Sequence, residues 1–428
     1  MMRRIGIAAL LVAAGVVVGA LVVSVMLETA NTPESLSPPA TTTVAAALPP
    51  VAAPATTQVE APEPSPTTVR GRPIAVPDDP HPEPAAPAAA TLDGFAGTGI
   101  VTVAAGGADL VAAPGGSAFV RAREGLVFPA DAIEGDWVRI LTTCDEDAWV
   151  NLAEVRAEPA ARGLEPGSGS DFAEAVIVVD AGHGGPNIGT SSPDGTLPEK
   201  VVNLDIARRL RDLLEQSHTV DWDSGTLYEG DEIPAAGRVI MTRVGVGEAG
   251  DYEAGLIYRA SLANRAGAHV LMSIHNNAGW EVELDHPGSD VFYQSQLAES
   301  RRLAELLVEE FQRGLAAFDA DWVGAIEWGA KSRLSPRDEV SQYYGILRRA
   351  QMPAVIAEGA YLANTSEARL LATADFRQAY AEAAYRAIVR FLTTDDVAGT
   401  PTYDPVVWAG FAGSGDPVAT CTVPVQGE

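Results

Sequence analysis

The chain has 428 residues, of which 57 are acidic and 29 basic, and its formal net charge at pH 7 is −28. This excess of negative charge repels phosphate backbones and anionic lipid headgroups. We therefore expect no nucleic-acid partner and no binding to an anionic membrane surface. Only two cysteines occur, which excludes both a thiolate zinc cage and a dense disulfide framework.

An apolar segment opens the chain. Residues 5–27 are almost entirely apolar and follow Arg3 and Arg4. At roughly 1.5 Å per helical residue they are long enough to cross a hydrocarbon core of ~30 Å, so we predict a transmembrane anchor rather than a cleaved signal peptide. Residues 1–4 would be a cytoplasmic stub, and everything after residue 27 would lie outside the cell membrane. If the segment is cleaved instead, the protein is secreted.

Residues 28–92 are rich in Pro, Ala and Thr. Half of the 30 prolines lie between residues 31 and 90, and the first aromatic residue of the chain is Phe95. Such a segment buries too little apolar surface to offset the entropy that ordering it would cost. We therefore predict a disordered linker that holds the folded part away from the membrane.

Short apolar runs separated by Gly, Pro and Asp fill residues 93–160. The runs GIVTV, SAFVRA, DWVRIL and DAWVNL have the length and spacing of strands in a small β barrel or sandwich. The segment with DWVRIL followed by CDEDAWVNL resembles bacterial Src-homology-three-like modules associated with the cell wall. That resemblance leaves two roles open, a wall-binding module and a plain spacer that packs on the next domain.

Strands and helices alternate over residues 172–396. Continuous apolar runs predict buried strands, and apolar residues at helical spacing predict the helices between them. The alternation indicates an α/β fold, with a mostly parallel sheet and helices on both faces. Residues 397–428 then form a C-terminal tail. The predicted strands are 175–182, 237–243, 268–275, 289–294 and 353–360, and the predicted helices are 199–217, 253–267, 296–315 and 374–393.

Four polar residues lie at the ends of these elements. His183 follows the first strand, His275 ends the third, Glu358 ends the last, and Glu199 opens the first helix. Because ligands bind beyond the carboxyl ends of parallel strands, we expect these side chains to meet at one edge of the sheet. Two imidazoles and one carboxylate make the ligand set of a catalytic zinc. We predict one Zn²⁺ ion held by His183, Glu199 and His275, with Glu358 as general base.

These residues belong to a larger set of motifs, which are the strand and GHGG turn at 176–185, Glu199-Lys200, Thr242-Arg243, Arg259 with Asn264, Ser273-Ile274-His275-x-Asn277 and Glu358-x-x-Tyr361-Leu362-x-Asn364. The set resembles the zinc-dependent N-acetylmuramoyl-L-alanine amidases of the third amidase family over residues 175–395. The resemblance implies the same three zinc ligands, catalysis by Glu358, and hydrolysis of the bond between N-acetylmuramic acid and L-alanine in peptidoglycan. We also predict that Asn277 and Arg259 bind the substrate.

Two positions depart from the family pattern. Asn187 follows the GHGG turn and His269 precedes the third strand, both at positions where an acid is common. We expect neither side chain to touch the proposed ligands, and we expect His269 to be buried in the packing of the sheet. The loops 244–254 and 276–288 leave the carboxyl ends of strands, so we expect them to rim the zinc.

Two other functions and one crosslink stay open. A zinc peptidase acting within the stem peptide needs the same residues, whereas a non-catalytic wall-binding module would lack at least one of them. Cys144 and Cys421 are predicted to form a disulfide that ties the tail to the small domain, and two independent thiols are the alternative. We expect a monomer anchored in the membrane, with peptidoglycan as substrate and any protein activator unidentified.

Overall fold

The computed structural model describes residues 72–80, 83, 85–245, 255–279, 286–323, 329–408 and 422–425. Within these residues, no helix combines the length and the apolar character that a membrane crossing requires. The predicted anchor, residues 5–27, and the first part of the predicted linker lie outside the described residues.

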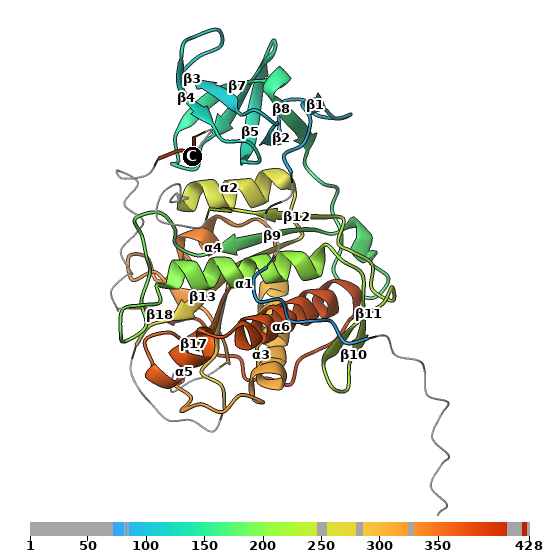
Figure 1. The fold of residues 1–428 in the computed structure, drawn as a ribbon, viewed down its shortest axis with the longest axis vertical. Coiled ribbons are helices and arrows are strands. Elements are labelled where there is room, and N and C mark those ends of the chain that lie inside the picture. The colour runs from blue at the N-terminus through green and yellow to red at the C-terminus, as the bar shows by residue number, and fades with distance from the viewer. Residues whose placement is uncertain are drawn as a thin grey trace, which may run out of the picture. The chain divides into compact units, whose positions relative to one another are not determined.

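Residues 90–159 form an eight-stranded sheet in the order β1-β8-β2-β5-β6-β7-β3-β4, here called the β module (Figure 1). Period-two alternation decides its buried face. In β6, Val138 and Ile140 are fully buried while the residues beside them are partly exposed. The strands are β1 (Ala90–Thr91), β2 (Gly99–Val103), β3 (Ala108–Val111), β4 (Ala118–Ala122), β5 (Val127–Glu134), β6 (Trp137–Leu141), β7 (Asp147–Asn151) and β8 (Val155–Pro159), with the 3-10 helix η1 (Leu152–Glu154) before β8.

A second sheet has six strands in the order β12-β9-β13-β17-β14-β15. The first four in that order are parallel, whereas β14 runs antiparallel to β17 and parallel to β15. The prediction of a mostly parallel sheet is therefore confirmed, with one edge reversed. The strands are β9 (Val176–Ala181), β12 (Arg238–Met241), β13 (Val270–Asn277), β14 (Asp290–Tyr293), β15 (Gly329–Lys331) and β17 (Ala354–Tyr361).

Helices cover both faces of this sheet, and its inner strand β9 is therefore buried along its whole length. On β9, Val179 faces the cluster formed with α1, α3 and α6, whereas Val178 faces the cluster formed with α2 and α4. The β module packs beyond α2 in this second cluster, and Figure 1 shows α2 between the two sheets. The helices are α1 (Glu199–Leu214), α2 (Leu256–Ala266), α3 (Ala298–Leu315), α4 (Gly345–Arg349), α5 (Thr365–Leu371) and α6 (Ala374–Thr393), with the 3-10 helix η2 (Phe172–Glu174) before β9.

Several short elements were not predicted. The acidic segment after α1 contains an antiparallel hairpin of β10 (His218–Asp221) and β11 (Thr226–Glu229). A further pair joins β16 (Arg333–Leu334) to β18 (Val406–Val407) in parallel. None of these strands contains more than two consecutive apolar residues, so no buried apolar run marks them, and each depends on a partner strand for its hydrogen bonds.

The end of the predicted linker contacts the folded part of the protein, whereas a disordered segment was predicted there. Arg209 on α1 donates hydrogen bonds to the backbone carbonyls of Pro77 and Asp78, at 2.9 and 3.0 Å. Pro73 forms an isolated bridge with Tyr228. Composition could not reveal this docking, because it uses backbone carbonyls that every residue carries and an arginine far along the chain.

The tail returns to the β module. The backbone N–H of Arg123 donates to the carbonyl of Pro424 at 2.8 Å, and Ala122 bridges Val425. Cys144 is buried and is not a free thiol. Its predicted partner Cys421 lies outside the described residues, so the pairing of these two cysteines stays a prediction.

Helices α3 and α6 are joined by a buried charge cluster, which allows a test of stability. The carboxylate of Glu310 accepts hydrogen bonds from Arg386 and Arg390, both at 2.7 Å. We expect Glu310→Ala to lower the free energy of unfolding by about 3 kcal/mol in urea denaturation, because the buried guanidinium of Arg386 loses its acid, whereas Arg390 keeps Glu309 and Asp396. The control is Glu299→Ala on the exposed face of α3, and an equal loss in both variants would contradict this expectation.

Candidate active site

The first predicted ligand lies in a constrained turn directly after β9. His183 has a φ of 62°, a left-handed conformation that costs a residue with a Cβ roughly 1–2 kcal/mol. Two buried arginines hold the turn through its backbone. Arg259 donates to the carbonyls of Ala181 and His183 at 2.8 and 2.7 Å, and Arg243 donates to those of Ala181 and Gly182 at 2.8 and 3.0 Å. The arginines thereby compensate for the strain.

Asp180 is buried beneath this turn. It accepts hydrogen bonds from Thr242, Ser273 and Arg259, each at 2.5 Å. Burial opposes its ionisation, but the Arg259 guanidinium and the two hydroxyls hold the pKa of this carboxyl below its ordinary value. One carboxylate thus connects β9, the residue after β12, β13 and α2.

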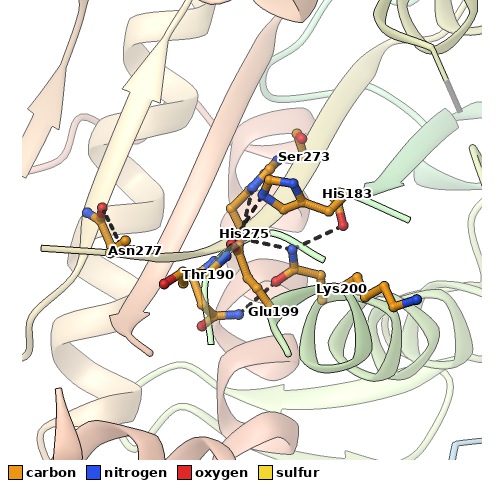
Figure 2. A network of polar contacts seen from close by, with 12 residues as sticks. His183, Thr190, Glu199, Lys200, Ser273, His275 and Asn277 are labelled. Atoms are coloured by element: carbon orange, nitrogen blue, oxygen red, sulfur yellow. Dashed lines mark hydrogen bonds and ion pairs between the residues drawn. The ribbon is translucent and has the colours of Figure 1, made fainter. Parts of the chain in front are cut away.

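The carboxylate of Glu199 lies between two imidazoles at the start of α1 (Figure 2). Its Oε2 is 3.1 Å from His183 Nε2, and its Oε1 is 3.1 Å from His275 Nδ1. The backbone N–H groups of Thr190 and Asn276 also donate to it, at 2.9 and 3.1 Å. Although burial opposes ionisation, the two imidazoles hold the pKa of Glu199 well below its ordinary value.

These three residues fit a metal ion. His183, Glu199 and His275 each offer one ligand atom, and the three atoms lie within 4.8 Å of one another. The two imidazole rings meet edge to face with centroids 4.9 Å apart. Two nitrogens and one carboxylate oxygen converging in this way form a three-ligand set that leaves a coordination position open.

The expectation that Asn187 touches no ligand is wrong. Its Oδ1 lies 3.0 Å from His183 Nδ1 and accepts a hydrogen bond from the N–H of Gly189 at 3.1 Å. With Nδ1–H donating to this oxygen, His183 keeps an unprotonated Nε2, which is the tautomer that binds a metal. The contact arises because Gly184 and Asn187 exchange two backbone hydrogen bonds of 3.0 Å, which fold the turn back on itself.

His269 is structural, as predicted. It is buried just before β13, where its Nδ1 accepts from the N–H of Val176 at 2.8 Å and its Nε2 lies 2.7 Å from the carbonyl of Arg162. Both ring nitrogens are therefore satisfied at the amino end of the strand, away from the ligand cluster.

Glu358 lies beside the ligand cluster, within β17 rather than at its end. The strand register pairs Glu358 with His275 on one side and with Asp290 on the other, so the three side chains share one face. The buried Oε2 of Glu358 has no hydrogen-bond partner among the described residues. Burial, together with the charges of Glu199 and Asp290, raises the pKa of Glu358 well above its ordinary value. Such a carboxylate is suited to take up a proton.

Both predicted substrate-binding residues make internal contacts. Arg259 is 1% exposed and donates to Asp180 and the turn, which favours a positioning role. Asn277 ends β13, and its Nδ2 donates to Asp290 at 3.0 Å. Residues 246–254 and 280–285, most of the two loops expected to rim the metal, lie outside the described residues.

Comparison with known proteins places this site in a family. The family model of N-acetylmuramoyl-L-alanine amidase matches residues 177–390, half of the chain. The chain belongs to this family. The matched region contains all four residues of the candidate site, and this amidase therefore acts on peptidoglycan.

Individual relatives of this amidase are more distant. The germination-specific N-acetylmuramoyl-L-alanine amidase of Bacillus subtilis is 26% identical over 225 residues, which cover 51% of this chain and 80% of the relative. N-acetylmuramoyl-L-alanine amidase AmiC of Neisseria meningitidis is 29% identical over 252 residues, 54% of this chain and 56% of the relative. The match thus spans little more than half of the Neisseria protein. The solved structure of AmiC2 of Nostoc punctiforme is 26% identical, with a TM-score of 0.38, and the match covers 53% of this chain and 99% of that one.

Gly182 leaves room for the imidazole of His275 and allows a direct test. A Cβ on Gly182 would lie 2.2 Å from His275 Nε2. We expect Gly182→Ala to displace the ring and to lower kcat/KM on peptidoglycan at least about tenfold, because small misplacements of reacting groups are costly. Gly163→Ala is the matched control, since its Cβ would meet nothing within 4 Å. Unchanged activity in the Gly182 variant would show that this close packing is not needed.

Proposed function

We propose that this amidase cleaves the bond between the lactyl group of N-acetylmuramic acid and L-alanine with one Zn²⁺ ion bound by His183, Glu199 and His275. The observation that carries the proposal is the convergence of these three ligand atoms within 4.8 Å, next to Glu358. Two imidazole nitrogens favour zinc over magnesium or calcium, which prefer oxygen ligands throughout.

Glu358 acts as general base and then as general acid in this proposal. A zinc ion at the site supplies a Lewis acid that acidifies water and polarises a carbonyl. Glu358 takes up a proton from the attacking water, which its unpartnered Oε2 and raised pKa support. It then delivers that proton to the nitrogen of the leaving alanine. Arg259 positions His183, and Asn277 remains the candidate for a substrate contact.

We further propose that the enzyme works outside the cell membrane, tethered by residues 5–27. The apolar length of that segment and the two arginines before it support this location. The family match favours the amidase over a peptidase acting within the stem peptide. A non-catalytic module would lack one of the four residues, whereas all four are present and adjacent.

Digestion of purified peptidoglycan tests the bond that is cleaved. Zinc-loaded enzyme should release peptides that begin with a free L-alanine, as identified by mass spectrometry, and chelator-treated enzyme should release none. Glu358→Gln should keep its zinc and lose turnover at least about a hundredfold, because the proton transfer is lost. His275→Ala should lose both zinc and activity. Shortened peptides still attached to sugar would instead identify a peptidase.

The hydrogen bond from His183 to Asn187 gives a separate test of the metal site. Asn187→Ala should weaken zinc binding about 10- to 100-fold, because the second ring nitrogen of a ligand histidine loses its acceptor. Asn187→Asp should bind zinc at least as tightly as the wild type, since a carboxylate is the stronger acceptor. Competition with a chromogenic chelator measures both affinities, and equal affinity in the alanine variant and the wild type would refute the role of Asn187.

A further inference from the structure

Arg333, the first residue of β16, is held among aromatic rings. Its guanidinium carbon lies 3.7 Å from the ring centroid of Trp408, 4.4 Å from that of Phe292 and 5.8 Å from that of Tyr344. Its Nη1 donates a hydrogen bond to the hydroxyl of Tyr344 at 2.6 Å. Stacking on ring faces fixes the plane of a guanidinium group while leaving its charge unneutralised.

The contacts of Arg333 leave one edge of the guanidinium group unused. Arg333 forms no ion pair with any residue that the structure describes, and its hydrogen bond there uses Nη1. The Nε and Nη2 edge has no described partner. That edge presents two parallel N–H groups, which match the two oxygens of a carboxylate. The residue is partly exposed, unlike the buried arginines that hold the His183 turn.

Arg333 also lies close to the proposed base. Phe292, on which it stacks, is two residues along β14 from Asp290, the register partner of Glu358. Phe292 and Glu358 are two residues apart along the strands and one strand apart across the sheet, so their Cα atoms are roughly 8 Å apart. In agreement with this placement, the positive charge of Arg333 opposes the influences that raise the pKa of Glu358.

Apart from the proposed zinc ion, the charged side chains closest to Glu358 are mostly acidic. Glu199 and Asp290 flank it, and the nearby cation Lys331 is already paired with Asp290 at 2.7 Å. The negative charges of these neighbouring carboxylates repel an incoming carboxylate. Arg333 is fixed in place and has no acid partner among the described residues, so its charge can help to offset this repulsion.

We propose that Arg333 binds the carboxylate of the stem-peptide residue that follows L-alanine. This inference rests on the proposed function, because it takes the cleaved bond to lie beside Glu358. Two extended residues span roughly 7 Å. A peptide leaving the cleaved bond therefore places its second residue about as far from Glu358 as Phe292, the ring on which Arg333 stacks, whereas the terminal carboxylate of a longer stem lies further away.

The test compares muramyl peptides whose second residue carries either a free carboxylate or its amide, cleaved by the zinc-loaded full-length enzyme. The wild type should prefer the acid. In Arg333→Gln the ratio of kcat/KM for acid over amide should fall about tenfold, chiefly through KM, because a charged hydrogen-bonding partner is lost. Arg333→Lys, which keeps the charge without the planar edge, should fall in between. Arg337→Gln, at an exposed arginine nearby in the chain, should leave the ratio unchanged.

Three results would overturn the proposal. An unchanged ratio in Arg333→Gln, including one that results from equal losses on both substrates, would show that Arg333 does not bind this carboxylate. A third substrate, in which only the terminal carboxylate is amidated, tests the other source of an anion. If Arg333→Gln lowers kcat/KM chiefly on substrates that keep the terminal carboxylate, the contact lies at the peptide terminus instead. If the wild type cleaves none of the three, the proposed function itself fails.

Discussion

The carboxylate of Asp180 is buried, and a buried charge is stable only when its partners are complete. Those partners come from Ser273 on β13, from Thr242 after β12 and from Arg259 on α2. Arg259 then reaches the carbonyl of His183, so the ion pair with Asp180 fixes the turn that carries the first ligand. Because loss of either charge would strand the other inside the protein, the ligand position and the stability of the sheet edge depend on the same interaction.

The β module is connected to this interaction through α2. Asp145, which precedes β7, accepts hydrogen bonds from the N–H groups of Ile257 and Tyr258 in the first turn of α2. The hydroxyl of Tyr258 donates to the carbonyl of Val127 on β5 at 2.7 Å. A carboxylate at a helix N-terminus satisfies N–H groups that have no partner within the helix. The β module therefore supports the helix that carries Arg259, and a wall-binding role for the module stays a prediction.

The site places carboxylates with opposite tendencies side by side. Two imidazoles surround Glu199 and lower its pKa, whereas burial and neighbouring acids raise that of Glu358. Lys331 and hydrogen bonds from Asn277 and Tyr361 satisfy Asp290 on the next strand. Environments that separate the pKa values of two carboxyl groups also separate their roles. Here they favour an ionised ligand in Glu199 and a proton carrier in Glu358.

The sequence by itself determined the alternation of buried strands and amphipathic helices, as in α6 at residues 374–393, because burial on one or both faces produces a local pattern. It also predicted the four candidate site residues, since polar groups in or next to apolar strands and at a helix start interrupt that pattern. Only the tertiary structure decided that Asn187 supports His183, that Arg259 is internal and that Arg333 stacks on aromatic rings, with no ion pair to any residue that the structure describes. These features depend on strand register, on the path of a turn and on contacts between distant residues, and side chains that meet only after folding produce no local pattern.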